Sequence, residues 1–295
     1  STGTASTNET LNLLNDAVGR AASSAVDSHS ELQALQATAQ DVMRLANGQT
    51  AQQTDANLLA GLKNLSGLST LNSTQLDLVK AAIAATADDG SAVDSVTELQ
   101  GVMQKAMALQ TLKNYSVSNS NSTPTLADYQ NAGLKAFDNL STENPGTDIG
   151  SGSAAFLTAN ILNTALDARD LSTETTADAI QTALQAMVNA YYRVLSEADG
   201  VVNTSTNTDV YANPSNNPSA NDPQRSDYEA LGVVLGSDAA LALLNDHVGL
   251  SADAAVDSVA ELNALAQAAE NAMVHAGAAA GSTPPASYST DAQWI

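Results

Sequence analysis

Two stretches near opposite ends of the chain decide the expected fold. Residues 11–19 read LNLLNDAVG, and residues 241–249 read LALLNDHVG. The same separation relates residues 25–28 to residues 255–258, which both read AVDS. One ungapped register therefore covers both pairs of stretches. This indicates an internal repeat rather than a coincidence of composition.

Two further copies lie between these stretches, and the four copies are spaced by roughly 65 to 85 residues. One copy is clear, because residues 92–100 read AVDSVTELQ. The other is degenerate: an approach segment runs from Phe156 to Asp167, and Thr175 to Asp178 replaces the Ser-x-x-Glu step. The chain is therefore predicted to contain four repeats.

The Ser-x-x-Glu step predicts the start of a long helix in each repeat. In such a capping box the serine hydroxyl accepts from a backbone N–H three residues on, and the glutamate accepts from the N–H of the serine. The predicted capping residues are Ser28, Glu31, Ser95, Glu98, Ser258 and Glu261, with Thr175 and Asp178 as an approximate pair.

Apolar residues recur at three- and four-residue steps around these boxes, which is typical of helices and not of strands. In the helices that precede the boxes, the predicted core positions include Leu11, Leu14 and Val18, and also Leu241, Leu244 and Val248. Behind the degenerate box the stripe includes Tyr191, for which we expect core packing, with Tyr192 beside it.

A second motif precedes these helices. Residues 123–134 read TPTLADYQNAGL, residues 222–233 read DPQRSDYEALGV, and residues 54–62 carry a weak form. Proline suits a first helical turn and glycine suits a left-handed C-cap. The motif therefore predicts a short leading helix of about two turns.

These elements predict an all-α fold of four degenerate helix-hairpin or three-helix units, arranged as a helical array or as tandem small bundles. Long polar stretches at 114–125, 141–153 and 203–224 are predicted as loops or linkers. The predicted divisions are repeat 1 (1–53), repeat 2 (54–122), degenerate repeat 3 (123–202), a polar loop (203–222), repeat 4 (223–281) and a C-terminal tail (282–295).

Composition excludes several classes of protein. The net charge is −22, from 32 Asp and Glu against 10 Lys and Arg. Binding to nucleic acid is not expected, because phosphate contacts need Lys and Arg. The chain has no Cys, which excludes disulfides, thiol catalysis and thiolate metal sites. No apolar run approaches the roughly 20 residues of a membrane span. Low charge density and the lack of Cys favour export to the cell surface.

No catalytic or cofactor-binding site is predicted, so we do not expect an enzyme. His29, His247 and His275 lack a second ligand at metal-binding spacing. The paired carboxylates Asp88 and Asp89 are a weak calcium candidate, since hard cations prefer oxygen ligands, but a helix C-terminal turn is the favoured interpretation. The stretch 147–150, TDIG, resembles an aspartic-protease loop only superficially. The recurring pairs Asn15-Asp16 and Asn245-Asp246 are expected in capping or turn roles.

The order of Thr-Pro, Asp-Tyr and Ala-Gly in residues 123–133, with the Val-Asp-Ser-x-x-Glu-Leu-Gln step of residues 93–100, resembles the Ala-rich helical repeats of large bacterial adhesins and biofilm-matrix proteins. The likeness is clearest over 54–134 and 222–275, and faint over 141–200. The resemblance implies a secreted structural or adhesive role, and it implies no catalytic residue.

The ends of the chain suggest assembly. Repeat 1 begins without a leading helix, whereas the tail carries Ser282-Thr283-Pro284, which repeats residues 122–124. The tail could therefore supply the leading element to another copy, through Pro284, Tyr288, Trp294 and Ile295. We expect a homopolymer with head-to-tail contacts: a filament, sheath or surface-layer subunit. The alternative is a fragment of a tandem-repeat adhesin that acts as a stalk or ligand-binding module.

Overall fold

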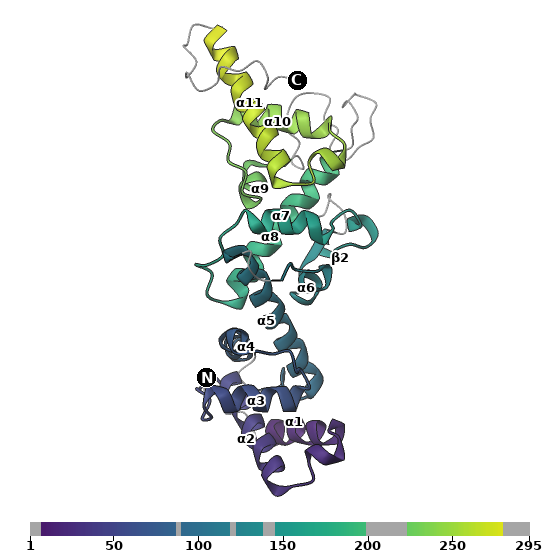
Figure 1. Cartoon of the computed structure of the whole chain (residues 1–295), viewed down its shortest axis with the longest axis vertical. Coiled ribbons are helices and arrows are strands. Elements are labelled where there is room, and N and C mark those ends of the chain that lie inside the picture. The colour runs from purple at the N-terminus through teal and green to yellow at the C-terminus, as the bar shows by residue number, and fades with distance from the viewer. Residues whose placement is uncertain (1–6, 87–89, 119–121, 138–144, 199–222, 280–295) are drawn as a thin grey trace. The chain divides into compact units, whose positions relative to one another are not determined.

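The computed structural model describes residues 7–86, 90–118, 122–137, 145–198 and 223–279. In these residues the chain forms eleven α-helices, three short 3-10 helices and one sheet of two strands (Figure 1). The prediction of an all-α fold is confirmed. The chain divides into two compact units. The first comprises the described residues up to Thr111 together with 174–180, and the second comprises 112–173 together with the described residues from Gln181.

The first unit is built around helix α2. Its helices are α1 (Thr7–Arg20), α2 (His29–Ala46), α3 (Asp55–Ser66), α4 (Ser73–Ala84) and the first part of α5 (Val96–Val117), with the 3-10 helix η1 (Ser23–Ala25) between α1 and α2. Helix α2 packs against α1, α3 and α4, and α3 also packs against α4. The apolar side chains Leu35, Ala39 and Val42 of α2 are buried in this core.

Helix α3 is longer than its sequence motif predicted. The weak leading motif placed a helix end at Gly61, but α3 continues through this residue to Ser66 and ends at Gly67, whose φ is +73°. Gly61 has another role, because a Cβ atom there would lie 2.0 Å from Oγ1 of Thr38 on α2. The missing side chain therefore lets α3 pack closely on α2.

The second unit contains the remaining helices. These are α6 (Leu126–Asn131), α7 (Ala159–Asp167), α8 (Ala177–Glu197, whose first residues belong to the first unit), α9 (Arg225–Ala230), α10 (Asp238–Gly249) and α11 (Val259–Ala279), with the 3-10 helices η2 (Gly152–Ala154) and η3 (Asp253–Ala255). Helix α10 packs on α11, as the two labels in Figure 1 show, and α11 also contacts α7.

A small antiparallel sheet departs from the predicted linker at 141–153. Strand β1 (Lys135–Phe137) pairs with β2 (Pro145–Asp148), so that the stretch 147–150 belongs to a hairpin and its following turn. The apolar residues of the hairpin explain its packing: Ala136, Phe137 and Ile149 are all buried. The ring of Phe137 meets Tyr192 edge-on at 5.6 Å between centroids.

The leading helices α6 and α9 end as predicted but begin differently. Gly133 and Gly232 follow them with φ of +75° and +83°, the left-handed conformation expected of a C-cap glycine. The prolines do not occupy the first turn. Pro124 and Pro223 lie one residue before the N-caps Thr125 and Gln224. Their carbonyl groups have a different role, described below.

Candidate assembly interface

A buried tyrosine joins each short leading helix of the second unit to the helix that follows it. The hydroxyl of Tyr129 on α6 donates to Oδ1 of Asn163 on α7 at 2.7 Å. Nδ2 of Asn163 in turn donates to the carbonyl oxygen of Pro124 at 3.0 Å. Tyr129 is fully buried and Asn163 is 6% exposed. The asparagine thus bridges both ends of the leading segment, and burial raises the pKa of the tyrosine hydroxyl.

The same set of bonds recurs between α9 and α10. Tyr228 donates to Oδ1 of Asn245 at 2.8 Å, and Asn245 donates to the carbonyl of Pro223 at 3.0 Å. Asn245 is 8% exposed. We name this arrangement the Tyr–Asn–Pro lock. Asn245 therefore lies inside a helix with a buried side chain, and the capping or turn role predicted for it is wrong.

Sequence reasoning found the tyrosines and prolines of this lock but not their partner. Asn245 was visible as one of the recurring Asn-Asp pairs, whereas Asn163 precedes a threonine and lies in the degenerate repeat. The signal that could have found it is the apolar frame, because Leu162 and Leu166 stand around Asn163 as Leu244 and Val248 stand around Asn245. All four of these apolar residues are fully buried.

The first unit replaces the lock in α3 and α4. Leu58 of α3 is fully buried at the position of the tyrosine. Lys80 of α4 stands at the position of the asparagine and forms ion pairs with Asp55 of α3 at 3.0 Å and with Asp77 at 2.8 Å. These carboxylates raise the pKa of Lys80, although its partial burial opposes the shift. The contact between leading helix and following helix is thus kept with other chemistry.

Helix α1 carries the asparagine without a described cover. Asn15 aligns with Asn245, yet its side chain is exposed, and Leu11 beside it is 48% exposed. Leu14 is also only half-buried, whereas its counterpart Leu244 is fully buried. The prediction of Leu11, Leu14 and Val18 as core positions is therefore wrong for α1. Its innermost residues are instead Leu13 and Ala17.

The other side of α1 contacts the beginning of α5. A carboxylate oxygen of Asp16 accepts from the backbone N–H of Val96 at 2.8 Å. Arg20 donates to Oγ1 of Thr97 at 3.0 Å. The Arg20 side chain and then the Val96 N–H hold the pKa of Asp16 below its usual range. A carboxylate here also suits the positive end of the α5 dipole.

Helix α7 makes the equivalent contact with the beginning of α11. Thr164 follows Asn163 as Asp16 follows Asn15, and its Oγ1 accepts from the N–H of Val259 at 3.4 Å. Val259 is the first residue of α11, as Val96 is of α5. The hydroxyl of Thr164 also bonds with Tyr191 at 2.9 Å. We name this arrangement, in which a preceding helix covers the start of a long helix, the helix-start contact.

The predicted capping residues lie where these long helices begin. The hydroxyl groups of Ser28, Ser95 and Ser258 each accept from the N–H of the third residue on at 3.3 Å, and Glu31, Glu98 and Glu261 accept from the serine N–H groups in return. In α8 the cap is Thr176 and not Thr175, since Thr176 accepts from Ala179. The degenerate repeat therefore has its cap one residue later than predicted.

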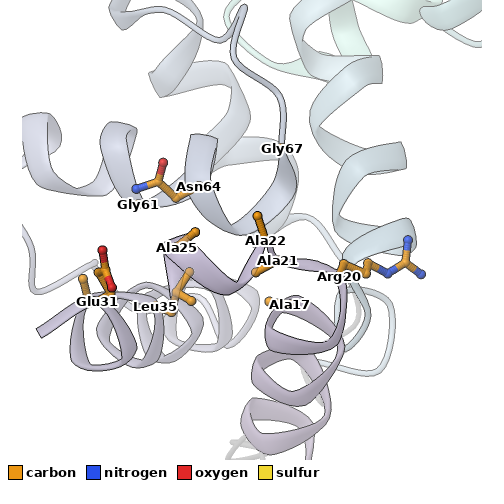
Figure 2. A pocket seen from close by; sticks show the side chains of 11 residues that line it. Ala17, Arg20, Ala21, Ala22, Ala25, Glu31, Leu35, Gly61, Asn64 and Gly67 are labelled. Atoms are coloured by element: carbon orange, nitrogen blue, oxygen red, sulfur yellow. The ribbon is translucent and has the colours of Figure 1, made fainter. Parts of the chain in front are cut away.

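An alanine-lined cavity of about 380 Å³ lies in the first unit, between the end of α1, η1, the first half of α2 and the second half of α3. Figure 2 shows Ala17, Ala21 and Ala22 around it, with Arg20 pointing away from it. Leu35 closes one wall, and Glu31 and Asn64 stand at the sides. Its small apolar lining suits an apolar side chain and offers no group for catalysis.

Several predicted site residues lie outside the described residues. These are the calcium candidates Asp88 and Asp89, and the assembly candidates Pro284, Tyr288, Trp294 and Ile295. The polar loop predicted at 203–222 also lies outside. In the described part of the chain, no three His, Asp or Glu side chains gather in a way that could hold a metal ion. His29 and His247 both have exposed side chains in this part.

No protein-family model, curated protein or solved structure matches this chain. None of the helices in the described ranges combines the length and the apolar character needed to cross a membrane. The arguments about function below therefore rest on the contacts described above.

Proposed function

We propose that this chain is an extracellular structural protein of a bacterial surface, a subunit that self-assembles head to tail into a filament, sheath or surface layer. The observation that supports this proposal is the exposed face of α1. Asn15 is exposed and Leu11 is 48% exposed, whereas Asn163 and Asn245 are covered by tyrosine-bearing leading helices.

The chemistry of the α1 face indicates what would cover it. A leading segment brings an apolar surface and a tyrosine hydroxyl, and both find a place on Leu11 and Asn15. The tail sequence 282–295 contains the prolines and the tyrosine of such a segment, together with Trp294. A tail that binds α1 of another copy buries different surfaces on the two partners. This contact is heterologous, and it continues indefinitely unless a ring closes.

The experiment is negative-stain electron microscopy with light scattering over a range of protein concentrations. Filaments, sheets or tubes are expected for the intact chain. Deletion of 282–295 should abolish them and leave the helical circular dichroism unchanged. Asn15→Ala should weaken assembly, whereas Gln33→Ala on the exposed face of α2 serves as the matched control. Assemblies that persist after the deletion would contradict the role of the tail.

The alternative is a ligand-binding module of a tandem-repeat adhesin, and the cavity of about 380 Å³ is the observation that favours it. An open cavity in a small core reduces packing, so a protein that keeps one gains from a function for it. Uniform monomers at all concentrations, together with binding of small apolar probes at Ala34, would favour this second function over the first.

A further inference from the structure

The long helices α2, α5, α8 and α11 differ at one corresponding position. The fourth residue of each is apolar: Leu32, Leu99, Ile180 and Leu262. Three of these side chains are fully buried, whereas Leu32 is 38% exposed. The first residue shows the same difference, because Val96 and Val259 are buried and His29 is exposed. The start of α2 is therefore the open member of the set.

The cover on α5 comes from a stripe of α1 with four-residue spacing. Asn12 donates to Asp94 at 3.1 Å, Asp16 accepts from the N–H of Val96, and Arg20 donates to Thr97. Residues four apart lie on one face of a helix. In the second unit Thr164 of α7 covers α11 in the same way. The helix-start contact thus has the same geometry in two independent places.

Helix α10 carries the corresponding stripe with nothing described upon it. Asp246 stands where Asp16 stands in α1, since the two stretches share one register. Ala242 and Leu250 precede and follow it by four residues, in the places of Asn12 and Arg20. All three are exposed, and Leu250 is 52% exposed. Leu32 and Leu250 thus belong to the small group of large apolar side chains that are exposed in the described ranges.

We infer that the α10 stripe of one copy docks on the start of α2 in a second copy. In this contact the carboxylate of Asp246 accepts from the N–H of His29, and Leu250 packs against the surface that Ser30 and Leu32 expose. The inference rests on the proposed head-to-tail assembly and names its second pair of surfaces, distinct from the tail and the α1 face.

The chemistry of the two surfaces is complementary. The first turn of α2 presents backbone N–H groups at the positive end of a helix dipole, and Asp246 is an anion. Burial of two exposed leucines adds about 1.5–3 kcal/mol for each side chain that becomes fully buried. The contact continues an arrangement that the chain already uses twice, in α1 with α5 and in α7 with α11. It also joins different surfaces of the two copies, as an open polymer requires.

Three variants of the intact chain test this contact by light scattering and electron microscopy. Leu32→Asp blocks the α2 surface, and the pair Asp246→Lys with Leu250→Asp blocks the α10 surface. Each should raise the concentration needed for assembly by about ten-fold or more. The controls are Val234→Asp, at a position that is 80% exposed and belongs to neither surface, and Glu229→Lys, which changes the net charge as Asp246→Lys does.

Mixing the two blocked variants gives a sharper result. One retains only its α10 surface and the other only its α2 surface, so together they should form a one-to-one dimer that neither forms alone. Because the chain has no Cys, His29→Cys with Asp246→Cys should also give disulfide-linked chains of many copies upon oxidation. Thr164→Cys with Val259→Cys provides the intramolecular reference for the same geometry.

The outcomes separate the inference from the function on which it rests. If the intact chain never associates, the proposed function fails and the inference fails with it. If the intact chain assembles, but the blocked variants assemble as readily and the cysteine pair links no copies, the inference alone is overturned. Circular dichroism of each variant verifies the fold, and the cysteine pair tests the contact even where a charged variant is unstable.

Discussion

The hydroxyl of Tyr228 lies 2.8 Å from Oδ1 of Asn245, and both side chains are buried. Because Asn245 also donates to the carbonyl of Pro223, one asparagine fixes both the start and the middle of the leading segment. Tyr129, Asn163 and Pro124 repeat the arrangement with nearly equal distances. A short helix such as α9 is marginal in isolation, so these bonds and burial must hold it.

Tyr228→Phe should lower the free energy of unfolding of the second unit by about 1–3 kcal/mol, because Oδ1 of Asn245 loses a buried donor. The ring and its packing stay unchanged. Urea unfolding followed by circular dichroism measures the difference. Tyr129→Phe should behave alike, whereas Tyr192→Phe, for which the described contacts give no hydroxyl bond, should have little effect. Equal losses in all three variants would contradict the lock.

The sequence predicted the helices well because their signals are local. Capping boxes at Ser28 and Ser258, and apolar steps of three and four residues, depend only on neighbours within one or two turns. The positions of Gly133 and Gly232 were predicted for the same reason, since a left-handed residue after a short helix needs a glycine.

The contacts that define the candidate interface could not be predicted in this way. Asp16 and Val96 are 80 positions apart, and Thr164 and Val259 are 95 positions apart. The hairpin of β1 and β2 forms around Phe137 and Ile149, whose packing partners lie on other elements. Gly61 was taken as a helix end because its close approach to Thr38 leaves no trace in the local pattern. These features depend on tertiary packing, which local propensity does not determine.

Gly61→Ala should destabilise the first unit by about 1–3 kcal/mol, because the added methyl group overlaps Oγ1 of Thr38. The Cβ atom would lie only 2.0 Å from that oxygen. Thr38→Ala in the same chain should recover much of the loss, since it removes the overlapping atom. Thermal unfolding of the two single variants and the double variant measures the coupling.

Gly101→Ala provides a control of opposite sign for the Gly61 series. Gly101 lies inside α5, and a Cβ atom there would meet no atom within 4 Å. Alanine is favoured over glycine in a helix by about 1 kcal/mol, so this variant should be more stable than the intact chain. Similar losses for Gly61→Ala and Gly101→Ala would show that close packing of α3 on α2 is not the cause.

Stability should fall in alkaline solution as the buried tyrosines ionise. Burial raises the pKa of Tyr191 to about 12, although the hydrogen bond with Thr164 opposes the shift. The ordinary value is about 10, so the folded state favours the protonated hydroxyl. Its contribution is complete below about pH 10 and is lost as the pH rises toward about 12.

Urea unfolding midpoints across this range measure the alkaline loss, and tyrosinate absorbance shows when the hydroxyls ionise. Tyr191→Phe should make the free energy of unfolding depend less steeply on pH, because the residue no longer titrates. The comparison concerns the slope with pH and not the absolute stability, since the variant also loses the bond to Thr164. An unchanged slope would mean that Tyr191 ionises normally in the folded protein.

Filling the alanine-lined cavity should stabilise the first unit. Ala34 lines the space of about 380 Å³ and lies inside α2, where leucine is nearly as favourable as alanine. Ala34→Leu should therefore raise the free energy of unfolding by about 1 kcal/mol, through partial burial of the added carbon atoms. Ala60→Leu, at an exposed position of α3 that does not line the cavity, should change stability little. Thermal unfolding compares the two. If both variants are equally neutral, the leucine at position 34 points to solvent and the cavity is filled in solution. If Ala34→Leu gains stability but also loses the binding of an apolar probe, the cavity is a binding site whose open volume lowers the stability of the unit.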